Sequence, residues 1–327
     1  MHKPGKTRSF LEVPEFVHNI QTRVPVLTVT GASPGPTLLC IAAQHGRELN
    51  GTAAIAEVFE QIDSDACCGC IRFVPVMNPP AVITLQQDFP TEVMRLRTRP
   101  DIHTLFNMNR GWTDEPPFAT LASHIVARVR DTLLCDADAL LDLHAWSLNT
   151  VPLAWSTPEH IEWARALGLP CFTAKTPSGK GLSRDATLAR NIPTVVAEFS
   201  GQSAVYIDSY RAAVRGIFNM LRFMGILEGD LERPEKQYEL AQSGGLRVLR
   251  AEADGLLVPW VRPGAFVHEG DVLGRIIALN NLETVQELRA TVKGICHRLG
   301  GVTWGEDLTE KGVVFKGQKV ASVHPVE

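Results

Sequence analysis

The sequence predicts an α/β domain built on a mixed, largely parallel sheet with helices on both faces, plus a small C-terminal all-β barrel-sandwich domain. Up to about residue 227, short apolar runs rich in β-branched residues alternate with segments of helical spacing. That alternation is typical of α/β domains. Beyond about residue 244, short alternating stretches separated by glycine turns replace the helical patterns, which is typical of a small barrel or sandwich.

The first domain is expected to span residues 1–240, and its elements follow one another in a regular order. Strands 24–31 and 37–44, joined by the turn "ASPGP", are predicted to be adjacent. A long loop rich in arginine, asparagine and proline is expected between 79 and 117, and loops of this length are usually functional or disordered. The remaining predicted elements are the strands 71–79, 138–146 and 193–201, and the helices 51–62, 118–133, 158–169 and 203–227.

The composition excludes several classes of function. The chain has 327 residues, 45% hydrophobic and 21% charged, and its formal net charge of -4 gives no attraction to nucleic acid or to an anionic membrane. No apolar stretch approaches the roughly 18 residues that a membrane span needs. The N-terminus lacks the apolar core of a signal peptide. We therefore expect a soluble, cytoplasmic protein that binds neither nucleic acid nor membranes.

Three segments place a metal-capable side chain at or just past the end of a buried strand. His45 and Glu48 follow "LLCIAA", and His144 closes "ALLDLH". Glu198 lies within the apolar stretch "TVVAEFSG". Because ligands gather at the carboxyl ends of parallel strands, these side chains can converge. Two imidazoles and one carboxylate are a ligand set of catalytic zinc, although the pattern H-x-x-E with a distant histidine is by itself a weak signal.

Each of these residues also has a purely structural interpretation. A histidine at a strand end is more often a hydrogen-bonded structural residue than a ligand, and Glu48 would complement the dipole of a following helix. An unpaired buried carboxylate is costly, so Glu198 is expected to face a polar site or a cation. Asp142, two residues before His144, shares its strand face and is a candidate to orient that imidazole.

Four motifs in this order resemble a known family: "AAQHGRELNG" (42–51), "NMNRGW" (107–112), "LLDLHAW" (140–146) and "PTVVAEFSG" (193–201). Between about residues 24 and 225 the chain resembles the succinylglutamate desuccinylase/aspartoacylase family, which belongs with the zinc carboxypeptidases of the carboxypeptidase A type. The resemblance implies a zinc carboxypeptidase-like fold. It also implies hydrolysis of the amide bond of a small N-acyl amino acid or related N-acyl amine by metal-activated water.

The resemblance assigns a role to each residue of the candidate centre. His45, Glu48 and His144 would hold Zn²⁺. Glu198 would be the general base and acid, a role that usually contributes about 10² to 10⁴ in rate.

Substrate binding is assigned to a second set of residues. Asn109 and Arg110 would bind a substrate carboxylate, a planar group that suits a guanidinium fork. An upstream arginine of the family polarises the scissile carbonyl. In "MRLRTRPD" Arg99 matches the family's spacing best, Arg97 second, and Arg95 is the third candidate.

Three functions stay open on this reading: a deacylase of small amides, a metallocarboxypeptidase acting on peptides, and a non-catalytic binding protein on the same fold. We prefer the deacylase, because residues 244–327 resemble the biotinyl/lipoyl-like barrel-sandwich of deacylase relatives. No lysine lies in "ALNNLETVQEL" (278–288), where a carrier domain would present one, and Lys293 has the pattern of an ordinary surface charge. Exposed barrel edges would favour a homo-oligomer.

Overall fold

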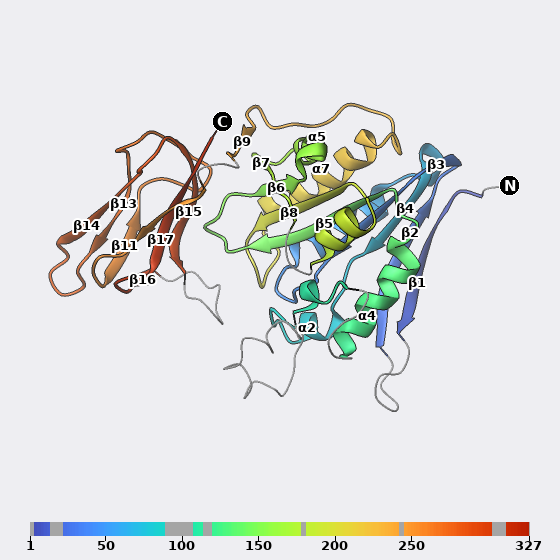
Figure 1. The fold of residues 1–327 in the computed structure, drawn as a ribbon, viewed down its shortest axis with the longest axis horizontal. Helices are drawn as coiled ribbons and strands as arrows, with labels where there is room; N and C mark the ends of the chain where they lie inside the picture. Colours follow the sequence, from blue (N-terminus) through green and yellow to red (C-terminus); the bar gives the residue numbers. More distant parts are fainter. Residues whose placement is uncertain are drawn as a thin grey trace.

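The structure, a computed structural model, describes residues 3–13, 22–88, 107–113, 120–177, 181–241, 245–302 and 312–326. Its larger part is a nine-stranded sheet (Figure 1). The strands are β1 (Gly5–Val13), β2 (Thr22–Thr30), β3 (Ser33–Ala42), β4 (Cys68–Val74), β5 (Ala139–Trp146), β6 (Leu153–Ser156), β7 (Cys171–Ala174), β8 (Thr194–Ser200) and β9 (Tyr238–Glu239).

The sheet is mixed and largely parallel, as predicted. Its order is β1-β2-β4-β3-β5-β8-β6-β7-β9. The four central strands β4, β3, β5 and β8 run parallel to one another. β2 is antiparallel to β4 on one side, and β6 is antiparallel to β8 on the other. The carboxyl ends of β3, β5 and β8 therefore lie side by side, which brings the three predicted site segments together.

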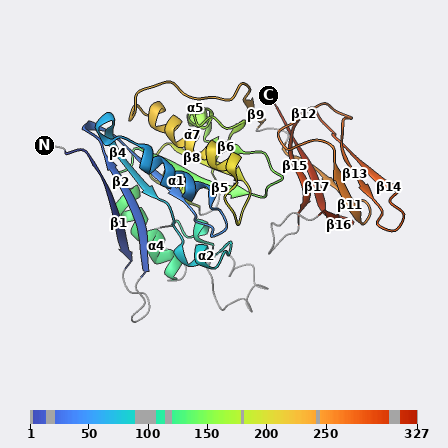
Figure 2. The same ribbon diagram turned by 180° about the vertical axis from the view of Figure 1, so that it is seen from behind.

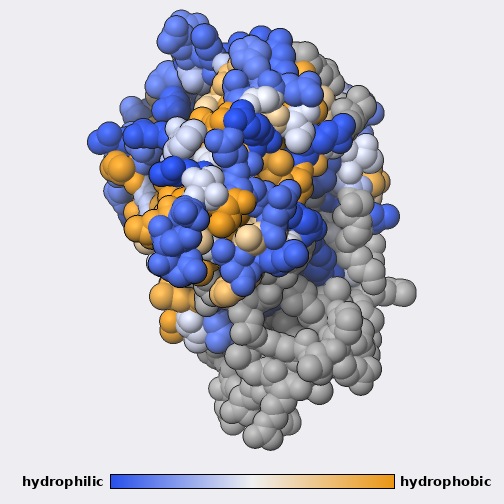
Figure 3. Space-filling view, turned by 90° about the vertical axis from the view of Figure 1, so that its left-hand side faces the viewer, coloured by the Kyte–Doolittle hydropathy of each residue, from blue (hydrophilic) through white to orange (hydrophobic). Residues whose placement is uncertain are grey.

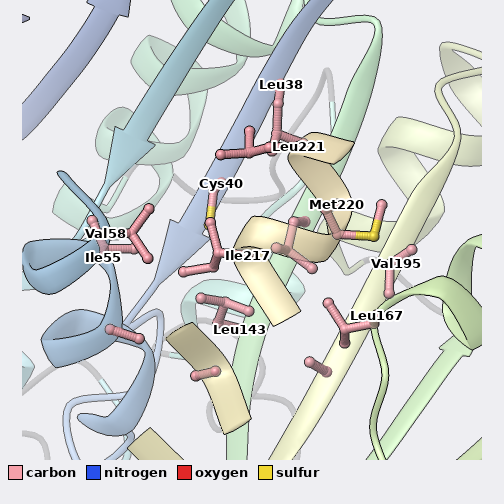
Figure 4. Packing of buried hydrophobic residues seen from close by; sticks show 14 of the residues in the cluster. Leu38, Cys40, Ile55, Val58, Leu143, Leu167, Val195, Ile217, Met220 and Leu221 are labelled. Atoms are coloured by element: carbon pink, nitrogen blue, oxygen red, sulfur yellow. The ribbon is translucent and has the colours of Figure 1, made fainter. Parts of the chain in front are cut away.

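Helices cover both faces of the sheet, again as predicted (Figures 1 and 2). The helices α1 (Asn50–Gln61), α5 (Ile161–Ala166) and α7 (Ile207–Phe223) pack on one face, where Leu38 and Cys40 of β3 point. Figure 4 shows this layer. Helix α4 (Leu121–Val129) packs on the other face, against Leu39. Burying each such aliphatic side chain stabilises the fold by roughly 1.5–3 kcal/mol.

Short helical turns complete the larger part. They include two short α-helices, three 3-10 turns and two π-helical turns. In chain order they are Ser64–Ala66, α2 (Pro79–Ile83), Met108–Arg110, Arg130–Leu134, Pro158–His160, α6 (Leu182–Arg184) and Asp185–Ala189. Among the residues that the structure describes, no helix has the length and apolarity needed to cross a membrane.

The predicted adjacency of strands 24–31 and 37–44 is wrong. The strands exist as β2 and β3, but β4 lies between them. The turn that joins them bonds to β4 instead of closing a hairpin: Gly31 N–H donates to the carbonyl of Gly69 at 2.9 Å, and Ala32 N–H donates to that of Cys67 at 2.8 Å. β4 lies between β2 and β3 because α1 returns the chain from the end of β3 to the start of β4, which pairs with β3 in parallel.

Four strands of the large sheet have no counterpart in the sequence prediction: β1, β6, β7 and β9. β1 is an edge strand whose side chains are mostly exposed, so its sequence "GKTRSFLEV" carries no buried period. β6, β7 and β9 have only two to four residues each. Alternation cannot be recognised over so few positions.

The C-terminal part consists of two four-stranded sheets in which every pairing is antiparallel, as the all-β prediction requires. On the face of the molecule shown in Figure 3, apolar side chains are scattered among polar ones. Trp260 and Phe315 are exposed apolar side chains of the C-terminal part. The strands are β10 (Arg247–Arg250), β11 (Gly255–Pro259), β12 (Phe266–Val267), β13 (Val272–Ile277), β14 (Thr284–Arg289), β15 (Gly294–Val302), β16 (Val313–Val314) and β17 (Lys319–Pro325).

The turn between β13 and β14, where a carrier domain would present its lysine, contains none. Lys293, which has the sequence pattern of an ordinary surface charge, places its ammonium 5.5 Å from the centre of the Phe266 ring.

The two parts meet where the chain leaves β5. Val151 N–H donates to the carbonyl of His297 at 2.9 Å, and Leu299 N–H donates to that of Asn149 at 3.1 Å. The ring of Trp146, the last residue of β5, lies edge-on to the His297 ring with centroids 5.0 Å apart. The C-terminal part therefore packs against the end of the strand that carries His144.

Candidate metal centre

The chain makes a sharp turn between β3 and α1, and this turn carries two of the predicted ligands. Ala43 adopts a left-handed conformation with φ of 53°. At Gly46 the backbone passes so close to the next loop that an added Cβ would lie 2.1 Å from the carbonyl carbon and oxygen of Ala81. Only glycine fits this position. The close approach holds His45 and Glu48 against the sheet edge.

Gly46→Ala is therefore expected to destabilise the protein. The methyl group would meet backbone atoms that cannot rotate away, so we expect the upper end of the roughly 1–3 kcal/mol typical of overpacking. Gly5→Ala is the matched control, because a Cβ there meets no atom within 4 Å. Urea unfolding followed by circular dichroism measures both. Equal midpoints for the two variants would show that the turn is not packed as described.

The structure brings His45, Glu48 and His144 into contact. Nδ1 of His45 lies 2.9 Å from Oε1 of Glu48, and Nδ1 of His144 lies 2.8 Å from Oε2. One potential ligand atom from each residue can be chosen so that all three lie within 4.8 Å of one another. All three side chains are buried. Two imidazole nitrogens and a carboxylate oxygen thus surround one point, a geometry consistent with a divalent metal ion.

The second ring nitrogen of each imidazole, Nε2, also makes the contact expected of a metal-binding histidine. Nε2 of His144 lies 3.1 Å from Oδ2 of Asp142, and Nε2 of His45 lies 3.2 Å from Oδ1 of Asn107. A carboxylate and an amide oxygen only accept hydrogen bonds, so each Nε2 donates its proton outward. Each Nδ1 faces an oxygen of Glu48, which is also an acceptor, so it carries a proton when no cation is present and offers its lone pair when a cation displaces that proton. The predicted contact between Asp142 and His144 is confirmed.

The centre carries buried negative charge that attracts a proton or a cation. Burial by itself would raise the pKa of Glu48, but the imidazoles of His45 and His144 hold it well below its ordinary value. Burial would lower the pKa of His144, but the carboxylates of Asp142 and Glu48 raise it well above the ordinary value. Two carboxylates around one imidazole therefore favour a positive charge here, and a divalent ion supplies it without protonation.

Further donors hold the Glu48 carboxylate in place. Its Oε2 accepts the backbone N–H of Ala145 at 3.1 Å. Its Oε1 accepts Nε2 of Gln87 at 3.1 Å and Nε2 of Gln202 at 3.3 Å. Gln202 also donates to the carbonyl of Ala145 at 2.6 Å. The carboxylate is thus anchored by one backbone N–H and two side-chain amides from three separate segments of the chain.

Glu198 lies beside this group on the next strand. In the parallel ladder between β5 and β8 it pairs with His144. Its Oε2 is enclosed and has no hydrogen-bond partner among the residues that the structure describes. Burial raises the pKa of Glu198 to about 8, although the neighbouring imidazole of His144 opposes the shift. An enclosed carboxylate with an unused oxygen beside a metal site is able to exchange a proton.

The segment predicted to bind substrate reaches the same edge. Oδ1 of Asn109 accepts the backbone N–H of Leu182 at 2.9 Å, which turns its Nδ2 toward His144, 3.3 Å from Nε2. Arg110 is exposed and donates to the carbonyl of Asn109 at 2.7 Å. The candidates for the carbonyl-polarising residue, Arg95, Arg97 and Arg99, lie outside the described residues.

Sequence reasoning missed the amide side chains around the centre: Gln44, Gln87, Asn107 and Gln202. In the sequence they stand in polar, glycine-containing or proline-containing stretches where amides are ordinary turn residues. Gln44 gave the one usable signal, because it directly extends the buried run "TLLCIAA". A polar side chain in that position needs a partner.

The comparison with known families decides what this centre belongs to. The model of the succinylglutamate desuccinylase/aspartoacylase catalytic domain matches residues 34–224, more than half of the chain. The chain belongs to the succinylglutamate desuccinylase/aspartoacylase family. The matched range contains every described residue of the centre, and the resemblance carried by the four sequence motifs is thereby confirmed.

The similarity to known proteins covers most of the chain. N-alpha-acetyl-L-2,4-diaminobutyric acid deacetylase from Halomonas elongata is 27% identical over 265 residues, 77% of this chain and 73% of that protein. The product-bound ectoine utilization protein EutE (DoeB) from Ruegeria pomeroyi superimposes with a TM-score of 0.77 at 23% identity, covering 99% of this chain and 96% of that one. A succinylglutamate desuccinylase from Silicibacter sp. TM1040 gives 0.77 at 22% identity, with the same coverage. These structures share the fold, including the C-terminal sheets.

Family membership and the His-Glu-His group together identify the protein as an amidohydrolase of the deacylase type with a site for a divalent metal ion.

Proposed function

We propose that this protein is a zinc-dependent hydrolase that cleaves the amide bond of a small N-acyl amino acid. The observation that carries the proposal is the position of Glu198. Its unpartnered carboxylate oxygen lies one strand away from two imidazoles and a carboxylate that share one centre. Three protein ligands leave room for a further ligand, as in catalytic zinc sites.

The donor set favours zinc among divalent ions. Two imidazoles and one carboxylate suit zinc, whereas calcium and magnesium take oxygen ligands. His45, Glu48 and His144 would hold the ion. When bound, zinc supplies Lewis acidity for activating water and polarising a carbonyl.

Glu198 would move the proton. Its Oε2 accepts a proton from the attacking water and delivers it to the leaving nitrogen, so that the amine departs neutral. A carboxyl group whose pKa burial raises toward neutrality can both take up and return a proton at the working pH.

Substrate recognition would come from the chain that follows the long loop. Nδ2 of Asn109 points toward the metal centre. The exposed guanidinium of Arg110 has no acidic partner among the residues that the structure describes, so it can turn to a substrate carboxylate. Arg99 is proposed to stabilise the oxyanion. Losing one such donor typically costs about 3 kcal/mol in the barrier.

The substrate class follows from the relatives. The protein from Halomonas elongata is named a deacetylase of an Nα-acetylated diamino acid, and several similar structures are named desuccinylases or aspartoacylases. We therefore propose an N-acylated amino acid as the substrate.

We also propose a cytoplasmic location, a domain boundary at about Gly244, and a structural role for residues 244–327.

A hydrolysis screen with the zinc-loaded protein tests the proposal. The panel contains N-acetyl and N-succinyl amino acids, Nα-acetyl-L-2,4-diaminobutyrate and short peptides, with release of free amine as the readout and Glu198→Gln as the control. We expect release from acyl amino acids and none from peptides. Release of C-terminal residues from peptides would instead make the protein a carboxypeptidase. No release from any compound by a protein with full zinc content would contradict the hydrolase proposal.

A further inference from the structure

A line of buried polar side chains runs from the core to the metal centre. Nε1 of Trp112 donates to Oε1 of Gln44 at 2.8 Å. Nε2 of Gln44 donates to Oδ1 and Oδ2 of Asp142 at 2.9 and 3.1 Å. Oδ2 of Asp142 then lies 3.1 Å from Nε2 of His144. All four side chains are at most 4% exposed. We call Trp112, Gln44, Asp142 and His144 the Trp112 relay.

The direction of every hydrogen bond in the relay follows from its first member. An indole N–H can only donate, so it selects the oxygen of the Gln44 amide. The NH₂ group of that amide must then face the opposite way, toward Asp142. The carboxylate accepts from Gln44 and from Nε2 of His144. With a proton held on Nε2, Nδ1 is the ring nitrogen that gives its lone pair to a bound cation, and it faces Glu48.

Two other groups near Nε2 of His144 cannot replace Asp142. Nδ2 of Asn109 lies 3.3 Å away and Nε2 of Gln44 lies 3.4 Å away, and both are donors. If the Gln44 amide were free to rotate, its oxygen would face the carboxylate and repel it. Asp142 would then lose two donated hydrogen bonds.

The backbone of Gln44 is held as firmly as its side chain. Its carbonyl accepts Nδ2 of Asn78 at 3.1 Å, and the N–H groups of Met77 and Asn78 donate to the carbonyls of Ala42 and Ala43 at 3.0 Å. With the backbone held, the side-chain torsions of Gln44 remain, and the indole N–H selects the direction in which the amide faces.

We propose that Trp112 and Gln44 are positioning residues of the metal centre, which act through Asp142 to hold His144 in the tautomer and orientation that bind the ion. This inference rests on the proposed zinc-dependent function. Trp112 also follows Asn109 and Arg110 closely in the chain, so the relay joins the proposed substrate-binding segment to the metal centre. Loss of such an outer partner typically weakens metal binding about 10–100-fold.

The test measures zinc affinity by competition with a chromophoric chelator for the wild type, Trp112→Phe, Gln44→Met and the double variant. Trp112→Phe keeps an aromatic ring and removes the N–H donor. We expect each single variant to bind zinc about 10-fold more weakly or worse. The double variant should bind no more weakly than Gln44→Met, because the indole acts only through the amide.

A matched control and a stability measurement separate positioning from packing. Trp163→Phe removes an indole of α5 that lies edge-on to the ring of Phe223 at the end of α7, and its zinc affinity should equal that of the wild type. Gln44→Glu, which keeps an acceptor for Trp112 and loses the amide donor, replaces Gln44→Met if thermal unfolding shows that the latter does not fold. It should also bind zinc more weakly.

The outcomes distinguish the relay from the function on which it rests. Wild-type affinity in Trp112→Phe, or losses in the two single variants that add in the double variant, would overturn the relay and leave the zinc site intact. A wild-type chain that binds no zinc would overturn the proposed function and the relay together.

Discussion

Replacing Glu198 with glutamine is expected to lower kcat by about 10² to 10⁴, the usual contribution of a general acid–base group, while the chain keeps one bound zinc ion per molecule. The amide has the shape of the carboxyl group but cannot accept a proton from water. Within the described part of the chain, Oε2 of Glu198 has no hydrogen-bond partner, so the substitution breaks no hydrogen bond of that oxygen there. The effect should therefore fall on turnover and not on folding.

The measurement combines steady-state hydrolysis of the best acyl amino acid with zinc analysis by mass spectrometry. Glu239→Gln in β9 serves as the control, because it makes the same chemical change at an exposed position of the same sheet. Near-normal kcat in Glu198→Gln would remove this residue from the mechanism. A loss of zinc along with activity would make it a ligand, contrary to the role proposed here.

The site shows which kinds of residue can be found from a sequence. His45, Glu48, His144 and Glu198 each interrupt or follow an apolar run, and a metal-capable side chain there is conspicuous. The parallel strand order brings these side chains together, because β3, β5 and β8 are neighbours and their carboxyl ends meet. Charged or imidazole groups next to buried strands therefore predict a shared centre even when almost 100 residues separate them.

The residues that orient these groups were not predictable in the same way. Gln44, Asn107 and Trp112 depend on pairings between loops that no local period encodes. Trp112 has the sequence pattern of a packing residue, and it does pack in the core beside Met108. Its N–H bond to Gln44 becomes visible only when β3 and the 107–113 segment are placed together.

The fold shows the same division. Long buried strands such as β8 follow from their continuous apolar runs, and amphipathic helices such as α7 follow from their helical period. The insertion of β4 between β2 and β3 does not, because strand order depends on tertiary crossovers and not on local sequence. Short strands such as β6 and β7 depend on pairing partners supplied from elsewhere in the chain.

His45→Ala is expected to abolish stable zinc binding and, with it, measurable hydrolysis. The variant removes one of three ligands and leaves His144 and Glu48, too few for a site that must also keep a position open for chemistry. The fold should survive. Glu48 keeps the imidazole of His144, the N–H of Ala145 and two glutamine amides as partners, so its buried charge stays compensated.

Zinc content after dialysis against a weak chelator, measured beside far-ultraviolet circular dichroism, checks this expectation. The control is His268→Ala. The side chain of His268, in the C-terminal part, is 68% exposed and is not expected to be a zinc ligand, so this variant should keep its zinc. One zinc ion per chain in the control and almost none in His45→Ala, with equal helical signals, would place the ion at the end of β3. Full zinc content in His45→Ala would mean that the imidazole contacts Glu48 for structural reasons alone, because the ion would then be held elsewhere. In that case Glu198 would also lose its assigned role, because its function depends on lying beside the ion.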